Sequence, residues 1–253
     1  MTLSSPAPIA VQLYTLRDAL QNDLPGVLKR LAQIGFIGVE PYSGMDHTQT
    51  AQLCRDLGLT VTSAHLPAPA GENETATLKA AELYGIKRII VPWQPQEYFK
   101  SMDGILHVCK LLNEANKVAH AHGLELGYHN HWGEVAIVDG RPAYQIMIDN
   151  LDADIFFEVD TYWVKTGGLD PVEVVKGLGK RAPLLHIKDG PAVMNEPMVA
   201  AGDGTLDIPG IVAAGSADWL VVELDNCATD MMTAVEKSYQ YLTSKGLAHG
   251  KNN

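Results

Sequence analysis

The sequence predicts an α/β protein folded as a single (β/α)₈ barrel, and three observations support this prediction. Short β-branched runs alternate eight times with longer segments of helical period, which is the pattern of parallel strands joined by crossover helices. The length of 253 residues falls in the range in which such a barrel forms one domain. Polar residues gather at the C-terminal ends of the apolar runs. We therefore expect residues 1–253 to form one barrel domain.

The eight expected strands are rich in β-branched and aromatic residues. In chain order they are Ile9–Leu16, Gly38–Tyr42, Thr60–Leu66, Arg88–Trp93, Leu124–His131, Phe156–Trp163, Pro183–Asp189 and Leu220–Asn226. Closing these strands into a barrel leaves no sheet edge, and right-handed crossovers place every helix outside.

The segments between the strands carry apolar residues at helical spacing. After the first strand, one helix face is formed by Leu24, Val27, Leu28, Leu31 and Ile34. Glycine adopts the left-handed cap conformation most readily, so four helix ends are predicted at Gly35, Gly58, Gly85 and Gly123. An open doubly wound sheet is the alternative fold. It predicts a glycine-rich phosphate loop after the first strand, and RDALQNDLPG contains no such loop.

Composition and charge restrict the class of partner. Hydrophobic residues make up 46% and charged residues 19%, as in an ordinary globular enzyme. A formal net charge of −11 would repel phosphate backbones, so nucleic acid is not an expected partner. We expect a small-molecule ligand, and the chain could form a homo-oligomer.

We expect a cytoplasmic protein that does not associate with membranes. The first ten residues lack the basic and apolar regions of a secretory signal. No apolar run approaches the ~20 residues that span a bilayer. The three cysteines are odd in number and lie outside any CxxC spacing, which is typical of a reduced compartment: Cys54, Cys109 and Cys227.

Four ionisable residues near the ends of consecutive strands form a candidate metal site. They are His129, Asp160, His186 and Glu223. Burying such groups in a barrel mouth costs several kcal/mol per unpaired charge, and a bound cation offsets that cost. Two imidazoles and two carboxylates suit one divalent metal ion, Mn²⁺, Zn²⁺, Co²⁺, Fe²⁺ or Mg²⁺, without selecting among them. Any one of these residues could instead have a purely structural role.

Further residues at the same strand ends are candidates for the pocket around this site. The predicted substrate-binding residues are Glu40, His65, Trp93, His131, Glu158, Trp163 and Asp189. Trp163, and less strongly Trp93, could form an apolar wall on which a sugar ring stacks, although either could be plain packing. Lys188 is a candidate proton donor, and His131 is the substitute metal ligand because residues two apart share a strand face.

Several segments resemble the sugar phosphate isomerase/epimerase group of xylose isomerase-like TIM barrels. They include VQLYTLRD, GFIGVEPY, LGYHNHWGE, FFEVDTYWVKTGGLDP, LLHIKDG, GDGTLDIPGI and VVELDN, in the expected order along nearly the whole chain. The resemblance implies one metal held by Glu, Asp, His and Glu on strands five to eight. The last three fall on Asp160, His186 and Glu223, whereas His129 stands at the strand-five position.

The resemblance implies chemistry next to a metal-chelated carbonyl of a keto-sugar or keto-cyclitol, through an ene-diolate. Glu223 is the expected base, with His129 or Lys188 as its acid partner. Reprotonation gives isomerisation or epimerisation, whereas loss of a β-hydroxyl or β-alkoxy group gives a dehydratase or lyase. The histidine at strand five departs from the ketose epimerases, so both outcomes stay open. A non-catalytic sugar-binding barrel and a DNA-repair nuclease are further alternatives, and the acidic charge disfavours the nuclease.

Overall fold

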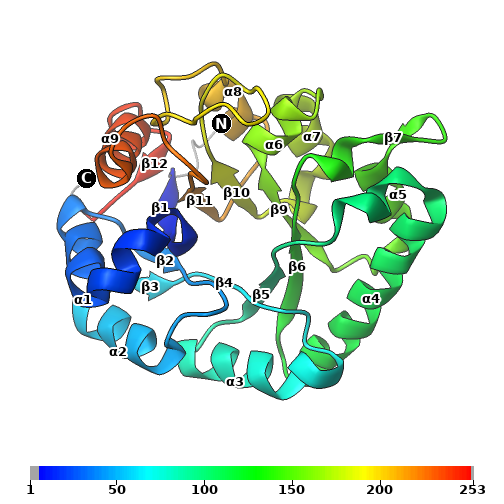
Figure 1. Ribbon diagram of the computed structural model, residues 1–253, viewed down its shortest axis with the longest axis horizontal. Coiled ribbons are helices and arrows are strands. Elements are labelled where there is room, and N and C mark those ends of the chain that lie inside the picture. The colour runs from blue at the N-terminus through cyan, green and yellow to red at the C-terminus, as the bar shows by residue number, and fades with distance from the viewer. Residues whose placement is uncertain (1–5, 252–253) are drawn as a thin grey trace.

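The computed structural model describes residues 6–251, and the strands form a nearly closed barrel surrounded by helices (Figure 1). The parallel strands are β1 (Ala7–Gln12), β2 (Gly38–Glu40), β3 (Thr60–Val61), β4 (Ala64–His65), β5 (Arg88–Val91), β6 (Glu125–His129), β9 (Phe156–Asp160), β10 (Leu184–Ile187) and β11 (Trp219–Val222). Within the described residues they follow the order β3-β2-β1-β11-β10-β9-β6-β5-β4. The predicted fold class is therefore confirmed.

The third predicted strand closes the barrel in two pieces. β3 pairs with β2, and β4 pairs with β5, so the same segment contacts both of its neighbours in turn. The backbone N–H of Thr62 still donates to Val39 and that of His65 to Pro41, so hydrogen bonding to the second strand continues through the break. β3 and β4 together correspond to the third predicted strand, so the nine observed strands of the barrel match the eight predicted ones.

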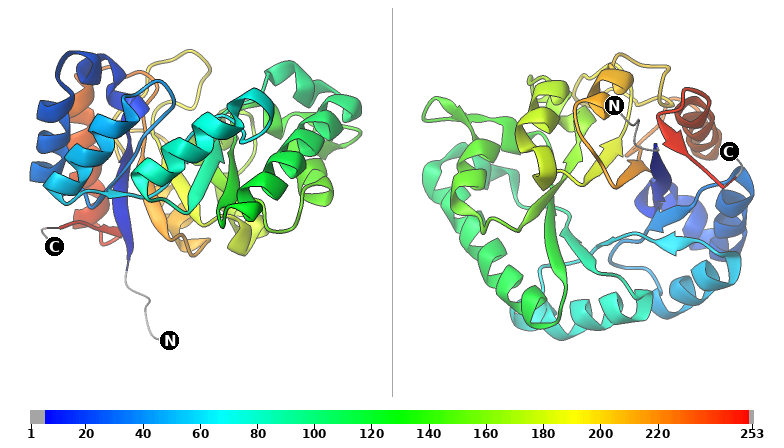
Figure 2. Two further views of the ribbon diagram at one scale, coloured as in Figure 1. Left: turned by 90° about the horizontal axis from the view of Figure 1, so that it is seen from below. Right: turned by 180° about the vertical axis from the view of Figure 1, so that it is seen from behind.

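Helices follow the strands on the outside of the barrel, as parallel crossovers require. They are α1 (Arg17–Ile34), α2 (His47–Leu57), α3 (Glu74–Tyr84), α4 (Met102–Ala121), α5 (Ala143–Asn150), α6 (Thr161–Thr166), α7 (Pro171–Leu178), α8 (Ile208–Ala213) and α9 (Met231–Ser244). Figure 2 shows this ring of helices from two further directions. A short strand β12 (Ala248–His249) pairs with the start of β1, and β7 (Ile137–Val138) forms a hairpin with β8 (Arg141–Pro142).

Two of the predicted strands extend several residues beyond the ends of the observed strands β1 and β9. Leu13–Leu16 form a 3₁₀ helix and not a strand, because Gln12 accepts the backbone N–H of Tyr14 through its side chain and turns the chain. Thr161–Thr166 form α6, which begins where Asp160 accepts the N–H of Trp163. Apolar residues continue past both strand ends, so the sequence pattern extended the strands into these turns.

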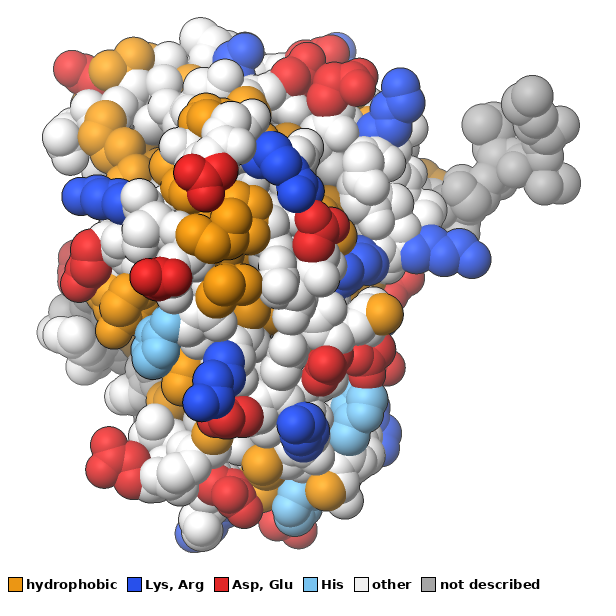
Figure 3. Space-filling view, turned by 90° about the vertical axis from the view of Figure 1, so that its right-hand side faces the viewer, with side chains coloured by type: hydrophobic (Ala, Val, Ile, Leu, Met, Phe, Trp, Pro, Cys, Tyr) orange, Lys and Arg blue, Asp and Glu red, His pale blue; other side chains and the backbone are white. Residues whose placement is uncertain are grey.

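The helix ends agree with the glycine prediction. Gly35, Gly58 and Gly85 cap α1, α2 and α3 in the left-handed region, and Gly123 adopts the same conformation just after α4. None of the described helices is both long and apolar enough to cross a membrane. Acidic and basic side chains are interspersed on the face that lies to the right in Figure 1, with patches of hydrophobic side chains between them (Figure 3).

Candidate metal centre at the barrel mouth

The four predicted metal ligands come together at the C-terminal ends of adjacent strands. His129 ends β6, Asp160 ends β9, His186 lies in β10, and Glu223 directly follows β11. These strands are neighbours in the sheet, and the Cα atoms of His186 and Asp160 are paired in register. All four side chains are buried, and each offers one ligand atom within 4.8 Å of the other three. The arrangement could hold one divalent ion.

Glu158 orients both imidazoles. His186 places Nδ1 2.7 Å from Glu223 Oε2 and Nε2 3.0 Å from Glu158 Oε2. His129 places Nε2 3.7 Å from Asp160 Oδ2 and Nδ1 3.3 Å from the same Glu158 oxygen. Each ring thus directs one nitrogen toward the carboxylates of Asp160 and Glu223 and the other toward Glu158. A carboxylate on the far nitrogen is the usual support of a metal-binding histidine.

The charge states of the two histidines differ. Burial, together with the charge of His186, lowers the pKa of His129 to about 3, so this imidazole is neutral and has a free lone pair for a cation. Burial alone would also lower the pKa of His186, but Glu158 and Glu223 raise it well above its usual range. In the metal-free protein His186 therefore carries a proton that a bound metal would have to replace.

The ammonium group of Lys188 lies between the carboxylates of the candidate centre. Its Nζ is 2.8 Å from Asp160 Oδ2, 2.8 Å from Glu223 Oε2 and 2.7 Å from Asp225 Oδ2. Burial opposes the charge of Lys188, yet Asp160, Asp225 and Glu223 raise its pKa well above the usual range. Burial raises the pKa of Asp160 to about 6, against the effect of Lys188. These carboxylates therefore attract a cation, and Lys188 would compete with a bound metal ion for Asp160 and Glu223.

A second layer of polar side chains lies beneath the centre. Glu40 accepts hydrogen bonds from Gln12 Nε2 at 2.7 Å and from the hydroxyl of Ser63, and its Oε2 is 2.9 Å from His186 Nε2. His65 Nε2 is 2.6 Å from Glu158 and 3.2 Å from Glu40. Buried polar groups need such partners, and this layer fixes the imidazoles from below.

A second set of four residues also lies close enough together to hold a metal ion. His65, His129, Glu158 and His186 offer ligand atoms within 4.8 Å of one another. Glu158 Oε2 already contacts a nitrogen of all three imidazoles, at 2.6 to 3.3 Å. We therefore treat His65 and Glu158 as support for the first set of four residues. In that first set, the carboxylates of Asp160 and Glu223 both contact the ammonium of Lys188.

A cavity of about 360 Å³ opens directly above the centre. Its lining includes five residues predicted from the sequence, namely His65, Trp93, His129, His131 and Glu223. Sequence reasoning missed the other five as site residues, namely Tyr14, Tyr42, Ser43, Pro92 and Asp225. The position of Asp225 two residues after Glu223 was a usable signal. Tyr14, Tyr42 and Ser43 follow the first two strands and Pro92 follows β5, and these four uncharged residues carry no comparable signal.

The remaining predicted residues lie around the cavity without lining it. Glu40 and Glu158 are fully buried below it, and Trp163 lines a neighbouring cavity. The carboxylate of Asp189 accepts backbone N–H groups of four loop residues, namely Gly190, Gly202, Gly204 and Leu206. Asp189 therefore holds the loop after β10, and its contact with substrate stays a prediction.

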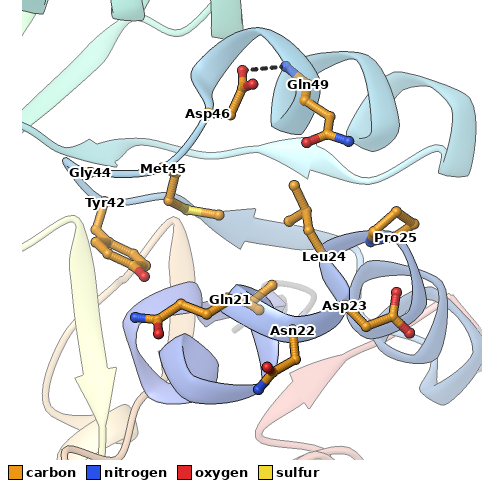
Figure 4. Close-up of a pocket in the computed structure, with 11 residues that line it drawn as sticks. Gln21, Asn22, Asp23, Leu24, Pro25, Tyr42, Gly44, Met45, Asp46 and Gln49 are labelled. Atoms are coloured by element: carbon orange, nitrogen blue, oxygen red, sulfur yellow. Dashed lines mark hydrogen bonds between the residues drawn. The ribbon is translucent and has the colours of Figure 1, made fainter.

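A depression of about 390 Å³ lies between α1 and α2 and meets the cavity above the centre at Tyr42 (Figure 4). Two of its carboxylates cap backbone groups: Asp46 accepts the N–H of Gln49 and Asp23 accepts that of Gly26. The depression therefore offers no cluster of free ionisable groups comparable to the barrel mouth.

An α/β barrel with convergent imidazoles and carboxylates at its mouth defines the class of protein. The sequence model of the xylose isomerase-like TIM barrel family matches residues 28–242, so the chain belongs to that family. None of the functionally curated proteins matches the chain in sequence.

Three solved structures illustrate the folds to which this chain is similar. A sugar phosphate isomerase/epimerase from Parabacteroides distasonis is 24% identical with a TM-score of 0.79, and the match covers 98% of each chain. An L-ribulose 3-epimerase is 18% identical with a TM-score of 0.65, covering 95% of this chain and 94% of that chain. A probable 3-DHS dehydratase from Bacillus anthracis is 12% identical with a TM-score of 0.70, covering 93% of this chain and 98% of that chain. At these identities the likeness shows the fold.

Proposed function

We propose that the protein is a metal-dependent isomerase or epimerase acting on a keto-sugar or keto-cyclitol. The observation that carries the proposal is the convergence of His129, Asp160, His186 and Glu223 on one point under an open cavity. The cavity of about 360 Å³ lies near the lower end of the range for small-molecule sites, which suits one sugar ring. Sugar isomerases and epimerases among the structural neighbours support the same class of reaction.

The four ligand residues would hold one divalent ion, which supplies a Lewis acid for a substrate carbonyl and its neighbouring hydroxyl. Glu223 is the base that removes the proton from the adjacent carbon. Burial raises the pKa of Glu223, but Lys188 and His186 lower it well below the usual range, so the carboxylate is ionised at neutral pH. Glu223 also lines the cavity, which gives its carboxylate access to substrate.

Replacing Glu223 by Gln tests this role. We expect proton exchange at the carbon next to the carbonyl to fall by ~10²–10⁴, the usual effect of losing a general base. The measurement is deuterium incorporation from D₂O into D-fructose, D-tagatose and methyl 3-keto-β-D-glucopyranoside in the presence of Mn²⁺, followed by NMR and mass spectrometry. Full activity of E223Q would show that another group is the base.

Glu236→Gln is the matched control, because this glutamate lies on α9 in a surface ion pair with Arg30. It should exchange deuterium at the rate of the unmodified protein. If the unmodified protein binds these sugars but never exchanges their protons, it is a sugar-binding barrel and not an isomerase.

A dehydratase or lyase is the second candidate, and the identity of His129 favours it. A neutral imidazole with a pKa of about 3 would be a poor acid on the opposite face of the substrate. Lys188, whose ammonium lies 2.8 Å from the proposed base, does carry a proton at neutral pH and is the alternative donor to a departing oxygen. The same D₂O experiment separates the two reactions: an isomer keeps the elemental composition of the substrate, whereas elimination releases water or an alcohol.

A further inference from the structure

A second cavity of about 290 Å³ adjoins the cavity above the candidate metal centre. The two cavities share Trp93, His131 and Asp225 in their linings, so these residues form the boundary between them. An apolar cavity of ~150 Å³ already accommodates a benzene molecule, so the second cavity has room for a six-membered ring. One sugar ring over the metal centre would leave this space vacant.

Aromatic rings form the wall of the second cavity. Trp132 and Trp163 pack edge to face with centroids 4.9 Å apart, and Tyr162 packs against Trp163 in the same way at 5.6 Å. All three line the cavity together with the apolar side chains of Val193 and Met194. Such a wall favours a flat ring with an apolar face.

The exposed apolar side chains of the described residues concentrate at these two cavities. Eight large hydrophobic residues are strongly exposed, and five of them line one cavity or both: Tyr14, Trp93, Trp132, Val193 and Met194. Scattered exposed hydrophobics need no explanation, but a group around an opening indicates a binding surface. Trp93, at 50% exposure, stands at the boundary where a linked second ring would pass.

The indole N–H of Trp163 supplies an independent sign of a ligand. Trp163 is only 9% exposed, and its Nε1 has no hydrogen-bond partner within residues 6–251. Leaving such a buried donor unpaired costs ~1–3 kcal/mol. His131 Nδ1, at the boundary between the cavities, is also buried without a partner in that range. Oxygen atoms of a bound ligand would satisfy both residues.

We propose that the substrate carries an aryl ring joined to the reacting sugar by a glycosidic bond, and that the second cavity binds this ring. The reacting sugar lies over the metal centre, and the aryl ring stacks on Trp132 and Trp163. The glycosidic oxygen or a ring hydroxyl accepts from the indole N–H of Trp163. This proposal rests on the proposed function for the position of the reacting sugar.

Equilibrium binding of two unreactive glycosides tests the second cavity. Titration calorimetry with phenyl β-D-glucopyranoside and methyl β-D-glucopyranoside, in Mn²⁺ buffer, compares a ligand that has the aryl ring with one that lacks it. We expect the phenyl glycoside to bind about tenfold more tightly, as one stacked ring should contribute. Trp132→Ala should bring the two dissociation constants within about twofold of each other and leave that of the methyl glycoside unchanged.

Trp132 is chosen because it is 36% exposed, so its loss should spare the fold. Leu111→Ala is the matched control, since Leu111 has the same 36% exposure but lies on α4, outside both linings. Met194→Ala, which removes another apolar side chain from the lining of the second cavity, is a second test should W132A fail to fold; it should reduce the phenyl preference about threefold. Equal binding of the two glycosides to the unmodified protein, or a full preference in both variants, overturns the proposal. Tighter binding of cellobiose than of the phenyl glycoside would show that the second cavity binds a second sugar and not an aryl ring.

These outcomes can be separated from failure of the proposed function. A protein that exchanges deuterium into a keto-sugar but binds both glycosides equally has the proposed chemistry and no aryl site. A protein that prefers the phenyl glycoside but never exchanges deuterium has the aryl site without that chemistry.

Discussion

Two buried side chains of opposite charge, Glu158 and Lys188, lie next to the candidate metal centre. Burial opposes the charge of Glu158, but His186 and His65 hold its pKa well below the usual range, so it stays ionised beneath the imidazoles. Lys188 approaches the same centre from the side of Asp160 and Glu223. A divalent ion bound to those two carboxylates and the ammonium of Lys188 would repel each other at close range. We therefore expect Lys188 to weaken metal binding.

Replacing Lys188 by Met should tighten Mn²⁺ binding by at least about tenfold, because a divalent ion and an ammonium group ~4 Å apart repel each other by about 8 kcal/mol at an effective dielectric of 20. Titration calorimetry at pH 7 measures the dissociation constant directly. In the absence of metal the variant should be less stable, since Asp160 loses its nearest cation and Glu223 keeps only His186 as a close one.

Lys176→Met, on the exposed surface of α7, is the control for loss of one positive charge. It should leave the affinity for Mn²⁺ within about twofold of the original value, because exposed charges are screened. An unchanged affinity in K188M would mean that the ammonium group does not compete with the ion.

Glu134 should make stability depend on pH. Burial raises its pKa from 4.5 to about 7, although Tyr128 donates to Oε1 at 2.5 Å and the N–H of His131 donates to Oε2 at 3.1 Å. The folded state therefore binds this proton more tightly than the unfolded state does. Stability from this group is complete below pH 4.5 and is lost as the pH rises through about 7.

Urea denaturation of the unmodified protein and of Glu134→Gln, each at pH 5 and pH 8, isolates this effect. The stability of the unmodified protein should fall relative to that of the variant by up to about 3 kcal/mol between the two pH values. A difference that does not change with pH would show that Glu134 titrates normally in the folded protein.

The four candidate ligand residues could be recognised from the sequence, but the side chains that pair with them could not. His129, Asp160, His186 and Glu223 stand out because each is a polar residue at the end of an apolar strand. Which carboxylates surround Lys188 depends on side-chain packing across three neighbouring strand ends, and the pattern of one strand carries no information about that. The unpaired indole of Trp163 is invisible for the same reason.

At the scale of elements, the loops after the strands build the site. β10 ends at Ile187, and the loop that follows it contributes Val193 and Met194 to the second cavity. Ala192 and Asn195 in this loop have positive φ angles, which cost free energy unless surrounding contacts fix the backbone. The sequence predicted a strand as far as Asp189, because apolar LLHI runs directly into KD.

Replacing Asp189 by Asn should loosen this loop, because a neutral amide cannot accept all four backbone N–H groups that the carboxylate binds. Limited proteolysis followed by mass spectrometry should show cleavage between residues 190 and 206 at a rate at least about tenfold higher. Mn²⁺ affinity should stay within about twofold of the original value, because Asp189 is not one of the predicted ligands. Equal cleavage rates would show that the loop is held by other contacts.

At the scale of the whole molecule, the barrel could be predicted because the same pattern repeats eight times. The alternation of strands and helices and the glycine helix ends do not depend on any one residue, so errors at strand ends did not change the fold. The break in the third strand between β3 and β4 could not be predicted. It depends on the local hydrogen bonding of Thr62 and Ser63 within the closed sheet.

The candidate centre joins four neighbouring strands that lie far apart along the chain, from His129 in β6 to Glu223 after β11. An ion that binds only the folded barrel should therefore stabilise the whole molecule. At a Mn²⁺ concentration of 100 times Kd we expect the free energy of unfolding to rise by about 2.7 kcal/mol. For a chain of this length that corresponds to roughly 5–10 °C in the melting temperature, and EDTA should reverse it.

Asp160→Asn distinguishes this centre from other places at which an ion could bind. Asp160 Oδ1 caps α6 by accepting the N–H of Trp163, and the amide oxygen of Asn can keep that bond. The substituted amide nitrogen would face the centre in place of Oδ2, so the variant should lose most of the Mn²⁺ stabilisation while it keeps the fold. Differential scanning calorimetry of both proteins, with Mn²⁺ and with EDTA, measures the effect. If D160N gains as many degrees from Mn²⁺ as the unmodified protein does, the stabilising ion binds elsewhere. The assignment of these four residues would then be wrong.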